Sequence, residues 1–325
     1  MGKIYLYSQI KTNYFKKDST QYKHKTDFYN ANAFYKKGRD REEKIFKELG
    51  ITGTASLVMG VLGRKYISKM EQALIFAPNK TFFPMLKNLT RVMQSVTTAP
   101  KNGLSLQHYY IPAKENKKTI IFCHGIIHNI TKFFNVADFL HKRGYGVLLL
   151  EYRGFGKNSG IPSEKAFAKD FHSAVEYLKK QGISQEQIVL WGFSMGGGVV
   201  LDAAKAHKFG GMILNSTFSD MKSAVKHQLK TTPVINNKFF QNILKRCPSN
   251  LIPIKSKFKN TSKIKKIDTK ILIMHAKDDT MVPFEMSKKL AKMAPNSELY
   301  ISETGGHDVL GWTEEKILHF LESLK

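Results

Sequence analysis

Residues 188–200 read IVLWGFSMGGGVV, and this stretch decides the fold. The apolar run 188–191 is typical of a buried strand, and the small residues that follow are typical of the start of a helix. A side chain at Gly192 or Gly196 would collide with a turn this tight, which explains why both positions are glycine. The pattern therefore predicts a strand, a sharp turn at Ser194 and a helix, with the serine hydroxyl lifted off the edge of a sheet.

The five residues from Gly192 to Gly196 form the pattern GxSxG, which is that of a nucleophile elbow. Glycine and serine also gather in ordinary turns, so the pentapeptide alone leaves a turn without chemistry open. The remainder of the chain favours the chemical interpretation.

Apolar runs of strand length recur from about Ala73 onward, separated by segments with helical spacing. Continuous hydrophobicity is typical of strands covered on both faces, as in a parallel sheet. The runs are 119–123, 147–150, 188–191, 212–214 and 271–274. Helices are expected at 132–142, 163–180, 194–206, 284–293 and 313–324. This alternation predicts an α/β fold with a mostly parallel central sheet and right-handed crossovers, and the alternating residues Leu104 to Tyr110 indicate an antiparallel lead-in.

Two regions are expected to lie outside this core. Residues 1–72 form a lysine-rich N-terminal extension with a short apolar helix at Ile51 to Gly63, and residues 73–325 form the main domain. Within that domain, residues 221–267 interrupt the alternation as a long insertion. An insertion at the carboxyl end of a strand overhangs the ligand crevice of such a sheet, so we expect it to act as a lid.

Charge is the second unusual property of the chain, because the formal net charge is +26. The insertion 221–267 contains no Asp or Glu and twelve basic residues, Lys222, Lys226, Lys230, Lys238, Lys245, Arg246, Lys255, Lys257, Lys259, Lys263, Lys265 and Lys266. Such a block can hold a protein on an anionic membrane surface, although a solvated, lysine-rich face without a partner is an equal alternative. Nucleic acid is a less favoured partner, because lysine far outnumbers arginine here and no nucleic-acid module is visible.

The ends of the chain and its cysteines say little about compartment. No standard secretory signal is visible, and the apolar stretch Ile51 to Gly63 is shorter than the about 20 residues that a membrane span needs. We interpret that stretch as an interfacial or buried helix. Cys123 and Cys247 lie far apart, so a disulfide framework is not indicated. A cytoplasmic or peripherally membrane-associated protein is expected.

A serine hydroxyl needs a base that removes its proton and an acid that orients the base. Two carboxylates, Asp278 and Asp279, come just after the apolar run 271–274. Further on, His307 follows two glycines in a loop. In chains with a GxSxG elbow, the acid and then the histidine follow the serine along the chain, each after a strand, and the order here is the same.

The chain resembles the α/β-hydrolases, in particular the Bem46 and ABHD13/ABHD17-like branch of serine hydrolases. The resemblance runs from about residue 74 to the end, and its segments are 122–125, 151–160, the elbow, 214–220, the Asp279 segment and Gly306-His307. It implies that Ser194 is the nucleophile, His307 the base and Asp279 the acid, with Asp278 as the alternative acid. It also implies that the backbone amides of Met195 and Ile126 form an oxyanion hole. The chain departs from the family at Ile126-Ile127, where apolar bulk should narrow the acyl pocket.

Cofactor and metal sites are not expected. Residues 154–160 have the spacing GxGxxxG rather than that of a dinucleotide loop, and Glu151 stands where a phosphate-binding loop needs its first glycine. The histidines at 124, 128, 275 and 307 are not accompanied by a CxxC pair.

The sequence therefore predicts a serine hydrolase that cleaves a carboxylic ester or thioester through an acyl-enzyme, with lipid or acylated substrates at a membrane surface. A serine peptidase of the same fold remains an alternative, because the fold does not decide the leaving group. A catalytically idle hydrolase scaffold that binds a membrane or a protein is the alternative from a different class.

Overall fold

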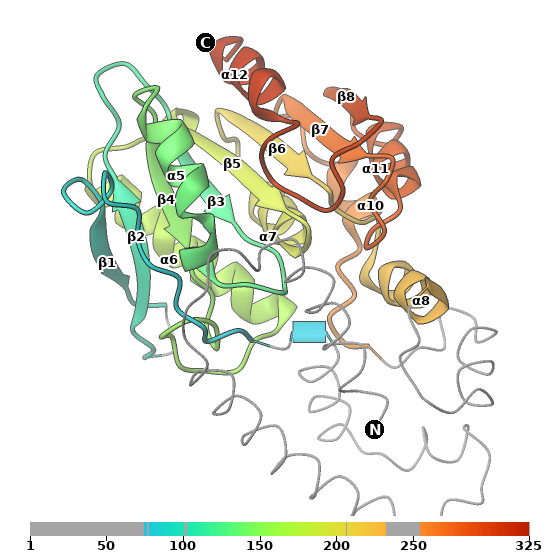
Figure 1. Cartoon of the computed structure of the whole chain (residues 1–325), viewed down its shortest axis with the longest axis horizontal. Coiled ribbons are helices and arrows are strands. Elements are labelled where there is room, and N and C mark those ends of the chain that lie inside the picture. The colour runs from blue at the N-terminus through green and yellow to red at the C-terminus, as the bar shows by residue number, and fades with distance from the viewer. Residues whose placement is uncertain (1–74, 77, 101–102, 206, 232–253, 325) are drawn as a thin grey trace, which may run out of the picture.

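The computed structural model describes residues 75–76, 78–100, 103–205, 207–231 and 254–324. The predicted extension 1–72, its apolar helix and the middle of the basic insertion lie outside the described residues. Within the described part, an eight-stranded sheet runs through the molecule with helices on both faces (Figure 1). In this part of the chain, none of the helices has the length and apolar character needed to cross a membrane.

The sheet has the order β1-β2-β4-β3-β5-β6-β7-β8. Its strands are β1 (Gln94–Thr98), β2 (Leu106–Ile111), β3 (Thr119–Cys123), β4 (Gly146–Leu150), β5 (Ile188–Phe193), β6 (Gly211–Asn215), β7 (Ile271–Ala276) and β8 (Ser297–Ser302). β2 pairs antiparallel with both β1 and β4, and every other neighbouring pair is parallel. The predicted α/β fold with its antiparallel lead-in is confirmed.

The helices are α5 (Phe134–His141), α6 (Glu164–Lys180), α7 (Met195–Ala204), α8 (Met221–Thr231), α10 (Asn260–Ile264), α11 (Phe284–Ala291) and α12 (Glu314–Glu322), with 3-10 turns η2 (Ile130–Phe133) and η3 (Gln185–Gln187). Five of these α-helices fall on the five predicted helical segments. The start of α6 shows how the sequence sets a boundary, because the Ser163 hydroxyl accepts a hydrogen bond from the amide of Ala166 at 3.2 Å.

Two hydrophobic layers sandwich the sheet. Successive residues of a strand point to opposite faces, so Ile121 joins one layer while Ile120 joins the other. The first layer includes side chains of α6, α7, α10 and α11, and the second includes side chains of α5 and α12. Every residue of β3, β4, β5, β6 and β7 is buried, which is why these strands read as continuous apolar runs.

The two described ends of the basic insertion contact each other and the loop after β7. The amide of Met221, at the start of α8, donates to the carbonyl of Lys257 at 3.0 Å. Further along α8, the side chain of Gln228 donates to the carbonyl of Met281 at 2.5 Å. The insertion therefore contacts the loop after β7, and the lid assignment for 221–267 stays a prediction because residues 232–253 are not described.

Candidate active site

Ser194 lies between β5 and α7 with a strained backbone. Its φ of 54° and ψ of −116° belong to a region that residues with a side chain rarely adopt, at a cost of about 1–3 kcal/mol. Two hydrogen bonds hold it there. The Ser194 amide donates to the carbonyl of Asn215 at 2.9 Å, and the Thr217 hydroxyl donates to the carbonyl of Ser194 at 2.7 Å. Strain fixed in this way at a serine is typical of a functional position.

The glycines around Ser194 are required by close packing, as the sequence predicts. A Cβ atom at Gly192 would lie 2.5 Å from the Cα atom of Gly197. A Cβ atom at Gly196 would overlap the backbone oxygen of Cys123 at the end of β3. The elbow therefore packs directly on the neighbouring strand, and larger residues at these two positions would displace the serine.

His307 and Asp279 are brought together by the loops after β8 and β7. Nδ1 of His307 lies 2.7 Å from Oδ2 of Asp279, and both side chains are buried. A carboxylate only accepts hydrogen bonds, so Nδ1 carries the proton and donates. In the neutral ring this leaves Nε2 as the basic nitrogen.

A second histidine, which the sequence reasoning did not assign to the site, donates to the same carboxylate. Nε2 of His275 lies 3.0 Å from Oδ2 of Asp279 and 2.9 Å from the carbonyl oxygen of Val282. Its other nitrogen, Nδ1, lies 2.7 Å from the Ser287 hydroxyl. The sequence does place His275 close to the acid, because His275 stands four residues before Asp279 at the end of a buried strand. The hydrogen bond from α11, through Ser287, cannot be predicted from the sequence.

The carboxylate of Asp279 is stabilised in its charged form. Burial by itself would raise its pKa, but His307 and His275 outweigh burial and hold the pKa well below the usual range. The second oxygen, Oδ1, accepts from the amides of Met281 at 2.8 Å and Val282 at 2.9 Å. Four donors thus fix this carboxylate in charge and orientation.

Asp278, the alternative acid, has a different position. Its Oδ1 accepts from the amide of Gly306 at 2.7 Å and its Oδ2 from the amide of Gly305 at 3.3 Å. These bonds hold the loop that precedes His307. Asp278 therefore contacts the backbone of the histidine loop, whereas Asp279 contacts the imidazole.

Several contacts place the His307 loop over the elbow. The ring of His307 packs on the ring of Phe193, the residue before Ser194, with centroids 5.0 Å apart. The side-chain amide of Asn215, at the end of β6, donates to the carbonyl of Val309 at 3.1 Å. Ser194, Asp279 and His307 are 6%, 7% and 9% exposed, so all three groups lie just beneath the surface.

The two predicted oxyanion donors follow strands that meet at the elbow. Met195 is the first residue of α7, where backbone N–H groups point out of the helix. Ile126 follows Gly125, and a Cβ atom at Gly125 would lie only 3.2 Å from Cβ of Ser194. The backbone at 125–126 therefore runs directly beside the serine. The Ile126 side chain is partly buried against the first hydrophobic layer.

A buried pair that the sequence reasoning missed supports this neighbouring loop. Nε2 of His124 lies 2.9 Å from Oε1 of Glu151, and Oε2 of Glu151 accepts from the amide of Ile130 at 3.2 Å. Gly156, with φ of 49°, leaves room for this carboxylate, because a Cβ atom there would overlap Oε2. The segment 151–160 thus serves to hold the loop after β3.

The chain is similar to known hydrolases. Residues 114–265 match the family model described as serine aminopeptidase, S33. The human protein ABHD12B is 30% identical over 200 residues, which cover 58% of this chain and 53% of that protein. Protein bem46 of Schizosaccharomyces pombe is 26% identical over 193 residues, covering 56% of this chain and 64% of that protein.

A solved structure shows the same fold. The esterase Pf2001 of Pyrococcus furiosus superposes with a TM-score of 0.60 at 19% identity, over 77% of this chain and 98% of the esterase. The elbow, the mostly parallel sheet and these similarities agree with one another. The chain therefore has the α/β-hydrolase fold and is similar to members of the α/β-hydrolase superfamily of the Bem46 type.

Proposed function

We propose that this protein is a serine hydrolase that cleaves a carboxylic ester or thioester, with Ser194 as nucleophile, His307 as base and Asp279 as the orienting acid. The observation that carries the proposal is the 2.7 Å hydrogen bond from His307 Nδ1 to Asp279 Oδ2, in a loop that packs on the elbow residue Phe193. This bond fixes the tautomer in which Nε2 carries no proton and can act as the base. The clamped, strained backbone of Ser194 supports a role for its hydroxyl.

In the proposed reaction, Nε2 of His307 takes the proton of the Ser194 hydroxyl while the oxygen attacks the acyl carbonyl carbon. The amides of Met195 and Ile126 donate to the oxyanion, where preorganised donors are worth about 3–4 kcal/mol each. The tetrahedral intermediate collapses when His307 returns the proton to the leaving alkoxide or thiolate. Water then attacks the acyl-enzyme by the same route, which releases the carboxylic acid and restores the Ser194 hydroxyl.

A fluorophosphonate probe and p-nitrophenyl acyl esters test the mechanism. Ser194→Ala should abolish both labelling and turnover, whereas Ser173→Ala, a change on α6 outside the proposed triad, should keep both. Turnover by Ser194→Ala at the rate of the unchanged protein would refute the nucleophile. Absence of labelling in the unchanged, folded protein would instead support the idle scaffold.

Peptidase activity is the second candidate, favoured by the match of residues 114–265 to a serine aminopeptidase family model. An ester and an amide place the same carbonyl at Ser194 but differ in the leaving group, which His307 must protonate. Matched substrates with one acyl group and either an alcohol, a thiol or an amine leaving group separate the candidates. Faster cleavage of the amine substrate would overturn the esterase assignment.

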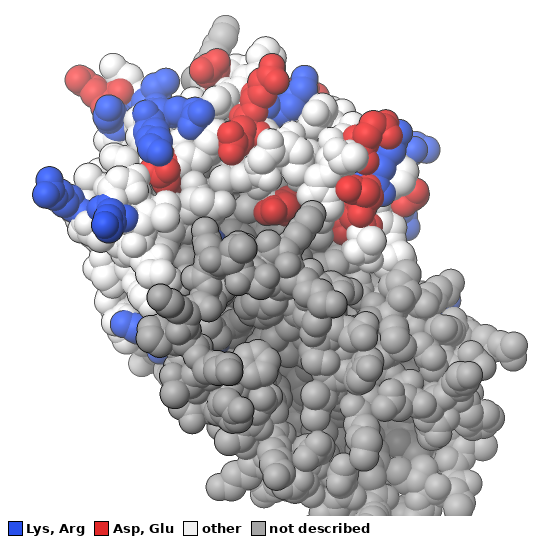
Figure 2. Space-filling model, in the orientation of Figure 1, with Lys and Arg blue, Asp and Glu red and all other residues white. Residues whose placement is uncertain are grey.

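We also propose that the Lys-rich insertion 221–267 docks on an anionic membrane surface, where lipid or acylated substrates are found. In Figure 2, the described surface that faces the viewer carries both signs of charge, so positive charge does not coat this face evenly. Sedimentation with neutral and with anionic liposomes tests this. Equal binding to both would remove the electrostatic part of the proposal.

A further inference from the structure

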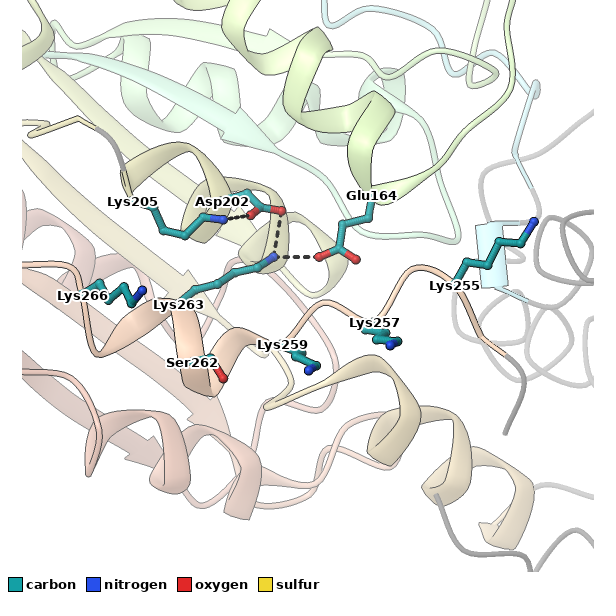
Figure 3. A pocket seen from close by; sticks show the side chains of 9 residues that line it. All are labelled: Glu164, Asp202, Lys205, Lys255, Lys257, Lys259, Ser262, Lys263 and Lys266. Carbon is teal, nitrogen blue, oxygen red and sulfur yellow. Dashed lines mark hydrogen bonds and ion pairs between the residues drawn. The ribbon is translucent and has the colours of Figure 1, made fainter. Parts of the chain in front are cut away.

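A pocket of positive charge lies on the sheet face that carries α6, α7 and α10. Its cavity of about 480 Å³ falls in the size range of small-ligand pockets. Figure 3 shows the side chains around it, which include two acids, Glu164 and Asp202. We call this cavity the basic pocket, because six lysines line it, Lys205, Lys255, Lys257, Lys259, Lys263 and Lys266.

The two acids are already paired by two of the lysines. Nζ of Lys263, which is 7% exposed, lies 2.9 Å from Oε1 of Glu164 and 2.8 Å from Oδ2 of Asp202. Lys205 binds the other oxygen of Asp202 at 2.7 Å. Figure 3 draws these three contacts as dashed lines. The acids therefore cannot neutralise the remaining lysines of the pocket.

Lys257, Lys259 and Lys266 are the lysines left with unbalanced charge. All three are exposed, and no carboxylate in the described part of the chain lies within ion-pair distance of them. Like charges that share a cavity repel one another, at an energy that salt screens only in part. An anion with more than one negative charge would relieve this repulsion.

The backbone that carries these lysines is held in place before any ligand arrives. Between them, Ser256, Phe258 and Asn260 are buried, and each is fixed by a hydrogen bond. The Glu164 amide donates to the Ser256 hydroxyl at 3.2 Å, the Phe258 amide donates to Oε2 of Glu164 at 3.0 Å, and the Asn260 side chain donates to the carbonyl of Phe218 at 2.9 Å.

This alternation of buried anchor and exposed lysine presents the ammonium groups on a fixed backbone. The Phe258 ring also packs on Gly198 of α7, where a Cβ atom would overlap the ring. Because residues 255–260 are already ordered, the entropic cost of binding a ligand is lower.

We propose that the basic pocket binds an anion that carries at least two phosphate groups. Ammonium groups donate in several directions and bind phosphate oxygens as point charges. Among the described residues, no aromatic or arginine side chain lines the cavity, so the stacking surfaces used for a nucleic-acid strand are missing from this set. A compact, multiply phosphorylated group, either free or on a lipid, fits the charge and the volume.

The pocket is separate from the proposed catalytic groups. Asp202 follows Ser194 by eight residues on α7, a distance of about 12 Å along the helix axis. The binding proposal therefore stands or falls independently of the hydrolase mechanism.

Calorimetric titration of the full chain with inorganic tripolyphosphate tests the pocket. The double change Lys257→Glu/Lys259→Glu should weaken saturable binding by about tenfold or more. The matched control Lys87→Glu/Lys180→Glu alters the net charge equally at two exposed lysines outside the pocket, and it should bind within about twofold of the unchanged protein. Circular dichroism checks that each variant folds, and Lys266→Gln provides a milder second variant.

Vesicles separate the two sources of phosphate. If the ligand is a headgroup, the unchanged protein should bind phosphatidylcholine vesicles that contain a bisphosphorylated inositol lipid and should not bind vesicles that lack it. The variant Lys257→Glu/Lys259→Glu should lose this binding. Tripolyphosphate binding without vesicle binding identifies a soluble anion, and either result supports the pocket. Absence of saturable tripolyphosphate binding, or an equal loss in the control variant, would overturn the proposal. Tighter, pocket-dependent binding of single-stranded DNA would overturn it in favour of nucleic acid.

Discussion

His275 and Asp279 are joined by a 3.0 Å hydrogen bond to Oδ2, the oxygen that also accepts from His307. His275 is fully buried, and its Nδ1 is anchored on Ser287 at 2.7 Å. The acid is thus held between two imidazoles, one fixed by the core and one at the surface of the site. Only His307 lies beside the elbow, so His275 can affect the elbow only through Asp279.

The two adjacent aspartates should differ sharply in their effect on turnover. Asp279→Asn removes the carboxylate that fixes the His307 tautomer, and a loss of about 10⁴-fold in kcat is expected. Asp278→Asn removes only acceptors for the Gly305 and Gly306 amides, and the loss should stay within about tenfold. Ester hydrolysis by both purified variants checks this. A larger loss for Asp278→Asn would exchange the roles of the two residues.

His275 should act as a positioning residue through Asp279. Hydrogen bonds to charged groups contribute about 1.5–3 kcal/mol, so His275→Phe should lower kcat/KM by about 10- to 100-fold and change the pH profile of kcat/KM. His275→Gln, which keeps an N–H donor near the position of Nε2, should recover part of the activity. An unchanged pH profile in a folded His275→Phe protein would limit the histidine to a structural role.

Stability should depend on pH through Asp279. Its pKa is held below the usual value by His307 and His275 against the effect of burial, so the folded state favours the carboxylate more than the unfolded state does. The stabilisation is therefore complete above the unfolded pKa of about 3.9 and is lost as pH falls from there towards the folded pKa. Urea unfolding at several pH values should show a smaller acid loss in Asp279→Asn. Parallel curves for the two proteins would contradict this linkage.

The buried ion pair between Arg153 and Asp170 should be costly to break. The Arg153 side chain and amide bind both oxygens of Asp170, with Nε to Oδ1 at 2.8 Å. Burial raises the pKa of Asp170, and the bonds from Arg153 offset this only in part. Asp170→Leu removes the carboxylate that these bonds hold and should cost about 3–5 kcal/mol of unfolding free energy.

The double change Arg153→Met/Asp170→Leu provides the control for that pair. It removes both charges and should recover a large part of the loss, because the buried positive charge is removed together with the carboxylate. Urea unfolding measures all three proteins. A double variant as unstable as the single one would show that packing, rather than charge, explains the cost.

The sequence predicts the sheet well because five strands are covered on both faces and so read as unbroken apolar runs. The run 119–123 corresponds to β3 without any shift. β1 was not assigned as a separate strand, since it lies at the edge of the sheet and three of its five residues are exposed. An edge strand lacks the apolar pattern on which such predictions rest.

The residues alone predict the local parts of the candidate site, and the resemblance adds one long-range part, the pairing of Asp279 with His307. The elbow follows from residues 192–196 alone, because the steric need for glycine is local. The contribution of His275 and the pairing of His124 with Glu151 depend on side chains that meet only in the folded chain. The spacing of Lys255, Lys257 and Lys259 does not show that the residues between them are buried and held by hydrogen bonds.

The parallel pairing of β8 with β7 has a consequence for biosynthesis. The serine and the acid are both present once the ribosome has passed β7, but the imidazole follows β8 and can reach Asp279 only after that last strand has docked. Under the proposed mechanism, a nascent chain would thus carry the elbow without its base. Catalysis would then begin only late in folding, after the sheet that supports the site is complete.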